Sequence, residues 1–68
     1  MNLIGILDYI NLESLITLYL NNNLVAMDVP IFSFPDRHDI NIYSNNEVLE
    51  IKAISKDRFA VYLKNSED

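Results

Sequence analysis

The stretch that decides the fold is EVLEIKAISKDRFAVYLK, residues 47–64. Its two apolar segments, 48–54 and 59–64, are rich in β-branched and aromatic side chains, which favour strands. The short polar segment between them, 55–58, contains Ser and Asp, which are common in turns. The pattern predicts a β-hairpin.

Alternation along these two strands assigns their side chains to opposite faces of the hairpin. One face carries six apolar residues: Leu49, Ile51, Ala53, Phe59, Val61 and Leu63. The other face carries Glu50, Lys52, Tyr62 and Lys64. An apolar face has to be covered by a second layer, so we expect the rest of the chain to pack against it.

The overall composition is that of one small globular domain, residues 1–68. Half of the residues are hydrophobic and 22% are charged, which is typical of a folded chain. The absence of cysteine excludes disulfides, thiolate nucleophiles and cysteine zinc sites. Because small secreted domains are usually cross-linked by disulfides, we expect a cytoplasmic location.

The charge balance is acidic, with a formal net charge of −5. Nucleic acids and anionic membranes select for clustered Lys and Arg, and the chain has only five such residues. We therefore predict neither a nucleic-acid partner nor a membrane partner. Five cations partly offset ten carboxylates, so the charge density also argues against mimicry of nucleic acid.

Residues 1–20 are the most apolar part of the chain. A membrane-spanning helix needs about 20 residues with few or no charges, and here Asp8 and Glu13 would lie within it. No basic residue precedes the apolar run and no small-residue cleavage site follows it, so we do not expect a signal peptide.

Helical spacing within this segment predicts a helix over residues 12–20. Asn11 is suited to the N-cap, and apolar residues recur every three to four positions, at Leu12, Leu15, Ile16 and Tyr19. The three asparagines 21–23 end the helix, because Asn tolerates the left-handed conformation. Residues 3–9 form either a short preceding helix capped by Asn2 or the front of one longer helix.

The middle of the chain changes to strand character. Over residues 24–34, apolar side chains alternate at Val25, Met27, Val29 and Ile31. Pro30 cannot donate a ladder hydrogen bond, so this strand is broken there or lies at an edge. Residues 40–43 predict another short strand, and 44–47 a turn into the terminal hairpin. The predicted class is α+β: an N-terminal helix, or a short helix pair, packed on an antiparallel meander of three or four strands.

Residues 15–25 resemble one leucine-rich repeat. Their pattern is Leu15-x-x-Leu18-x-Leu20-x-x-Asn23-x-Val25, which follows L-x-x-L-x-L-x-x-N-x-L. The resemblance implies a truncated or capping-type repeat module. A second copy one repeat further along departs from the pattern, with Arg37 and Glu47 at apolar positions, and a solenoid needs about three repeats.

One charged loop offers side chains for chemistry. Asp36, His38 and Asp39 are of the types that ligate metals, and Ser33 with His38 and Asp36 supplies the residue types of a catalytic triad. No second ligand cluster or nucleophile elbow accompanies them, and a single glycine excludes a phosphate loop or dinucleotide fingerprint. A solvated turn is the better interpretation, so we predict no enzyme activity, no metal site and no cofactor.

Six residues are predicted to contact a partner: Phe32, Phe34, Arg37, His38, Leu18 and Leu20. The first four surround the charged loop, and aromatic residues beside Arg are enriched in binding hot spots. The two leucines lie on the part of the predicted helix that does not cover the sheet, where they would add to an exposed apolar patch.

The function that these observations favour is protein binding without catalysis. A composition rich in Asn and Ile and poor in Gly and Pro follows AT-rich codons, which suits an inhibitor or regulator of phage or plasmid type. The alternative is a self-associating structural homo-oligomer. Small domains seldom gain more than about 3–5 kcal/mol from one core, so we expect a homodimer held partly by residues 12–20.

Overall fold

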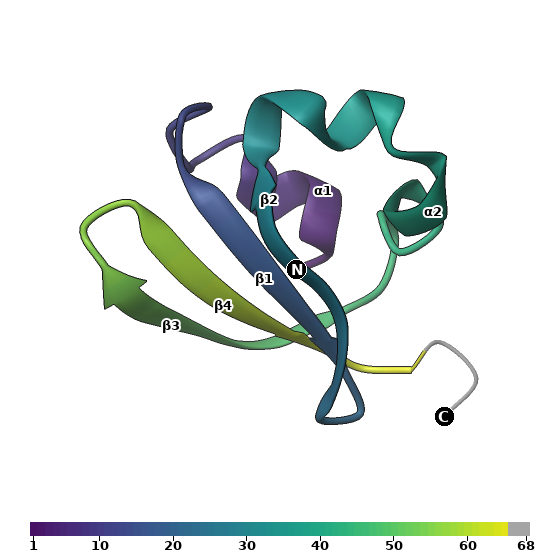
Figure 1. The fold of residues 1–68 in the computed structure, drawn as a ribbon. Coiled ribbons are helices and arrows are strands. Elements are labelled where there is room, and N and C mark those ends of the chain that lie inside the picture. The colour runs from purple at the N-terminus through teal and green to yellow at the C-terminus, as the bar shows by residue number, and fades with distance from the viewer. Residues whose placement is uncertain (66–68) are drawn as a thin grey trace.

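The computed structural model describes residues 1–65, which form short helices and a four-stranded sheet (Figure 1). The elements in chain order are α1 (Leu3–Leu7), β1 (Leu15–Leu20), β2 (Asn23–Pro30), the 3₁₀ helix η1 (Ile31–Asp36), α2 (His38–Asn41), β3 (Val48–Ser55) and β4 (Arg58–Leu63). The predicted α+β class is confirmed.

The predicted terminal hairpin is confirmed as β3 and β4. Ile51 pairs with Val61 across this antiparallel ladder, so both side chains lie on the same face, as predicted. Leu49 departs from the predicted face because the register shifts beside it, between Val48 and Glu50. An extra residue in one strand breaks the alternation, and Leu49 is exposed.

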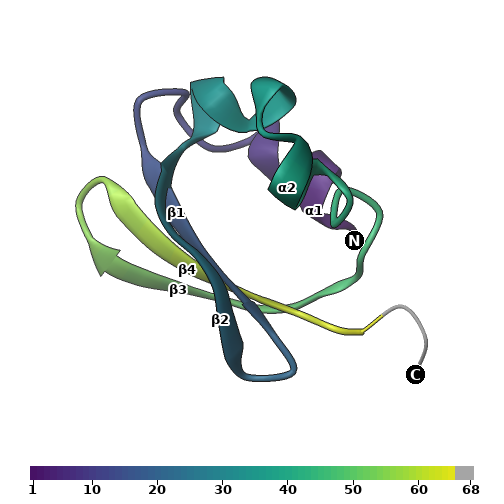
Figure 2. The ribbon, with the colours of Figure 1, turned by 45° about the vertical axis from the view of Figure 1, so that its right-hand side comes forward.

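The sheet has the strand order β2-β1-β4-β3. The two outer pairs are antiparallel hairpins, whereas the central strands β1 and β4 are parallel. The sheet is therefore mixed, although mostly antiparallel. The two hairpins meet through the parallel pair of β1 and β4, whereas a continuous meander would pair each strand with the next one in the chain. Figure 2 shows that the helices all lie over one face of the sheet, which we call the inner face.

Residues 15–20 form the central strand β1, so the predicted helix over 12–20 is wrong. Ile16 and Leu18 are fully buried on the inner face, while Thr17 and Tyr19 alternate onto the opposite, outer face. The strand is favoured because β-branched and aromatic side chains fit a pleated surface. Hydrogen-bonded neighbours on both sides, β2 and β4, also satisfy the strand's peptide groups.

The asparagines after β1 do adopt the predicted left-handed conformation, but in a different element. Asn21 and Asn22 have φ of 52° and 66°, and they connect Leu20 to its partner Asn23 in the antiparallel hairpin of β1 and β2. Positive φ at both central positions is the mark of a type I′ turn, whose twist matches that of the flanking strands. This immediate return of the chain into an antiparallel strand differs from a leucine-rich repeat, whose strand is followed by a helical or 3₁₀ segment.

The left-handed conformation of Asn22 in this turn leads to a prediction about the free energy of unfolding. We expect Asn22→Val to lower the free energy of unfolding by about 1–2 kcal/mol, because a β-branched residue pays the steric cost of the left-handed conformation. Asn22→Gly should not lower it, since glycine adopts positive φ freely. Urea titrations followed by circular dichroism measure both. Asn23→Val is the matched control within the strand, and an equal loss there would contradict the turn assignment.

The strand predicted within residues 24–34 is confirmed as β2, which ends at Pro30 and lies at an edge of the sheet. Its predicted alternation is not kept, because the register shifts along this pair and Met27 is exposed. The irregularity includes Asp28, whose φ is 49°. The Asp28 N–H donates to Thr17 Oγ1 at 3.2 Å, which satisfies this peptide group.

Residues 40–43 do not form the predicted strand, because residues 40 and 41 belong to α2 and residues 42 and 43 form the turn after it. The N–H groups of Ile40 and Asn41 both donate to the Arg37 carbonyl, at 3.2 and 2.9 Å. Local hydrogen bonds thus replace a sheet ladder. Ile40 is buried while Ile42 is exposed, so these two residues do not share one face, as they would in a strand.

The core lies between the inner face of the sheet and the helical layer. Its largest fully buried side chains are Phe34, Leu3, Ile16, Leu18, Ile40, Leu63, Val29 and Val61. The predicted short helix capped by Asn2 is confirmed as α1, since the Gly5 N–H donates to Asn2 Oδ1 at 3.0 Å. Asn46 links α1 to the sheet: its carbonyl accepts from the Leu3 N–H at 3.0 Å, and its Nδ2 donates to the Lys64 carbonyl at 2.9 Å.

Candidate protein-binding site

The most exposed element of the sheet is the edge strand β3. Its only ladder within the described sheet is with β4, and all of its residues after Val48 are exposed. Among them, Leu49, Ile51 and Ile54 are large and apolar. In an antiparallel ladder, alternate residues direct their N–H and C=O groups to the far edge. Strand β3 therefore presents apolar side chains together with peptide groups directed away from β4.

An apolar groove of about 610 Å³ borders this strand on the inner face. Ile6, Tyr9 and Ile10 line one wall, from α1 and the turn after it, and Ile51 and Phe59 line the other wall, from the terminal hairpin. The groove exists because the helical layer does not extend over the β3 edge. Ile51 is consequently 42% exposed, although its partner Val61 is fully buried.

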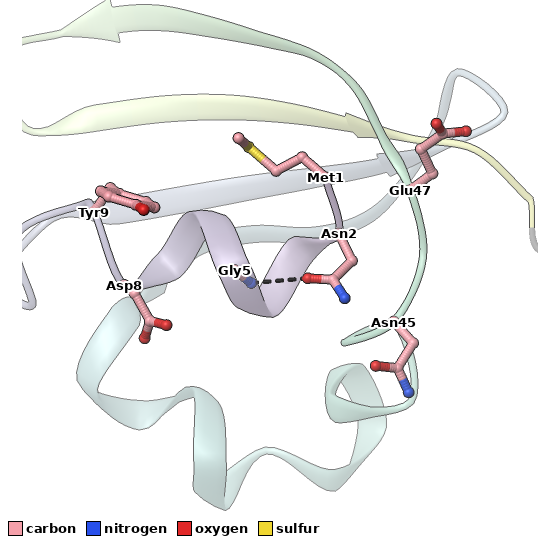
Figure 3. Close-up of a pocket in the computed structure, with 7 residues that line it drawn as sticks. All are labelled: Met1, Asn2, Gly5, Asp8, Tyr9, Asn45 and Glu47. Atoms are coloured by element: carbon pink, nitrogen blue, oxygen red, sulfur yellow. Dashed lines mark hydrogen bonds between the residues drawn. The ribbon is translucent and has the colours of Figure 1, made fainter.

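A second hollow, of about 700 Å³, lies beside α1 and is more polar (Figure 3). Its charged lining residues are Asp8 and Glu47, whose carboxylates lie near opposite ends of α1 and point away from each other in Figure 3. The side chain of Asn2 is occupied as the N-cap of α1. The lining acids do not converge on one point, so this hollow has no arrangement of groups for acid–base chemistry.

The outer face of the sheet is not covered by helices (Figures 1 and 2). Tyr19 and Tyr62 stack there, with ring centroids 4.8 Å apart and an interplanar angle of 9°. Lys52 Nζ lies 5.3 Å from the centroid of the Tyr62 ring and 3.9 Å from Glu50 Oε2. These contacts place Lys52 and Glu50 on the outer face at the β3 edge, as predicted from alternation.

The six residues predicted to contact a partner are not gathered into one surface. Phe34 and Leu18 are buried in the core and Leu20 is packed against it, so these three do not form exposed patches. Phe32 is 63% exposed and His38 is also exposed. Of the six residues, only Phe32 and those of the charged loop therefore remain at the surface.

The charged loop is held by an ion pair at the protein surface. Arg37 donates from Nε to Asp39 Oδ1 at 3.0 Å and from Nη2 to Asp39 Oδ2 at 2.9 Å. These hydrogen bonds lower the pKa of Asp39 and raise the pKa of Arg37. Because both groups are exposed, the pair adds little to stability. Within residues 1–65, no group of three or more His, Asp and Glu is placed to hold a metal ion.

Sequence reasoning missed the groove because it assigned Ile51 to a covered face. The alternation of β3 gives the direction of that side chain but not the extent of the layer above it. The residue types in 48–55 do not show whether the helical layer extends over this strand or leaves it exposed.

In comparisons with known proteins, no protein-family model, curated protein or solved structure matches this sequence. Within the described part of the chain, none of the helices has the length and apolar character needed to cross a membrane.

Proposed function

We propose that this protein is a non-catalytic binding module that takes an extended segment of a protein partner along the β3 edge. The observation that carries the proposal is the combination of a sheet edge open for pairing with an apolar groove beside it. Strand addition uses both features, because main-chain hydrogen bonds at the edge give affinity and pockets for alternate side chains give specificity.

The chemistry of the groove specifies the kind of segment that fits. An added strand would direct every second side chain toward the inner face, where the lining is mainly apolar. The favoured partner segment is therefore extended, with apolar residues at alternate positions. A cytoplasmic inhibitor or regulator that captures such a segment suits a cysteine-free chain of this size.

Selection from a random peptide library on the immobilised protein tests this proposal. We expect the enriched peptides to alternate apolar and polar residues, and to bind at least about tenfold more weakly to Ile51→Lys. That substitution places a charge in the groove at a position that is already partly exposed, so circular dichroism should show an intact fold. Leu24→Lys is the matched control, since Leu24 is exposed on the opposite edge strand, β2. Peptides whose affinity is equal for both variants would contradict the proposed site.

A further inference from the structure

We infer that the strand paired with the β3 edge is β3 of a second copy of this chain, antiparallel to the first, with the two-fold axis at Ile51. This inference rests on the proposed function, because it names the partner of the same site. The observation behind it is the order of charges around Ile51: Glu50 precedes it and Lys52 follows it on the outer face.

The charges select one register. Directly opposed residues of an antiparallel pair lie on the same face, where opposite charges attract and like charges repel. An axis at Ile51 places Glu50 opposite Lys52 of the second copy, and Lys52 opposite Glu50 of the second copy. An axis at Glu50 or at Lys52 would instead oppose two identical charges. The charges therefore favour a two-fold axis at Ile51 over an axis at Glu50 or at Lys52.

The direction of the peptide groups agrees with this register. The Val48 N–H donates to the Met1 carbonyl at 2.8 Å and thus points away from β4. Counting through the extra residue at Leu49, alternation gives the N–H and C=O of Ile51 the same outward direction. Ile51 can then exchange two hydrogen bonds with its copy at the axis. Glu50 and Lys52 fall in the adjacent non-hydrogen-bonded pairs, where side chains of opposed residues approach most closely.

The apolar surface at the same edge supplies a reason for the copies to associate. Ile51 lies on the inner face beside the groove and would meet Ile51 of the second copy at the axis. The register shifts near Leu49 and Ile54 restrict the regular part of the ladder to residues 50–52, because residue 53 would face Leu49 of the second copy. The contact is short, so we expect an equilibrium between monomer and dimer rather than an obligate dimer.

A charge-reversal experiment tests the pairing by analytical ultracentrifugation at low salt. The unmodified chain should dimerise. Glu50→Lys places two cations on each edge and Lys52→Glu places two anions, so each variant alone should dimerise about tenfold more weakly or worse. An equimolar mixture of the two variants should form heterodimers, because the cationic edge is then opposed by the anionic one. Recovery on mixing also shows that both variants are folded.

The double variant Glu50→Lys with Lys52→Glu should recover the homodimer, since it exchanges the two charges without removing the complementarity. The inference is overturned if the unmodified chain stays monomeric at several hundred micromolar, or if either single variant dimerises as tightly as the unmodified chain. It is also overturned if the mixture fails to recover dimers. If peptides from the library still lose affinity for Ile51→Lys in those cases, the proposed function stands and the partner is a different protein.

Discussion

Val61→Asp is expected to unfold the protein. Val61 is fully buried, at the centre of the sheet, where it pairs with Leu18 of β1 on one side and Ile51 of β3 on the other. A carboxylate at this position would lie in the core without a partner, at a cost of several kcal/mol. That cost is comparable to the about 3–5 kcal/mol that a core of this size supplies. Far-ultraviolet circular dichroism at 25 °C should show loss of the sheet signal.

The control for this prediction is Leu24→Asp, which introduces the same carboxylate into a strand. Leu24 lies in the edge strand β2 and is exposed, so the new charge remains in water and the protein should stay folded. Equal loss of structure in the two variants would contradict the placement of Val61 in the core.

Phe34→Ala is expected to cost about 3–5 kcal/mol in the free energy of unfolding. Phe34 is 1% exposed and is the largest of the fully buried side chains. It lies in η1, which connects β2 to the helical layer, so its removal opens a cavity where that layer meets the sheet. A urea titration should show either a strongly lowered midpoint or no folded baseline.

The neighbouring Phe32 supplies a matched comparison within the same 3₁₀ helix. Phe32 is 63% exposed, so Phe32→Ala should change the free energy of unfolding by only about 0.5 kcal/mol. The sequence places the two aromatic residues in equivalent positions beside the charged loop. Similar losses from the two substitutions would show that η1 does not orient them as described.

The parts of the fold that could be predicted from sequence are those that depend on local chemistry. The terminal hairpin follows from two dense runs of strand-forming residues around a polar turn. The positive φ of Asn21 and Asn22 follows from the tolerance of Asn for that conformation. The capping of α1 by Asn2 is equally local, since the cap and the N–H that it accepts are separated by one turn.

The parts that could not be predicted depend on contacts distant in sequence. Residues 15–20 satisfy helical and strand spacing together, and the choice is made by pairing with β4, which the local pattern does not contain. The register shift beside Leu49 likewise arises where residues 1 and 2 and the end of β4 meet the start of β3.

The candidate site was the least predictable feature. Phe34 and Leu18 have the residue types of a contact surface, but the same types form a core, and burial decides between the two. Ile51 was expected to be covered, and its exposure depends on where the helical layer ends. The charges of Glu50 and Lys52 were assigned to the correct face, yet their order has a meaning only once β3 is known to be an edge strand.

The parallel pairing of β1 with β4 has a consequence for how the protein forms during translation. Leu15 pairs with Arg58, and Leu20 pairs with Leu63, so β1 gains its second neighbour only after β4 has left the ribosome. Until then the hairpin of β1 and β2 has an open apolar face and an open central edge, and an isolated hairpin is marginally stable in water. Because the cost of closing so long a loop must be met before the pairing is gained, we expect the β1–β4 pairing to form later and more slowly than the two hairpins.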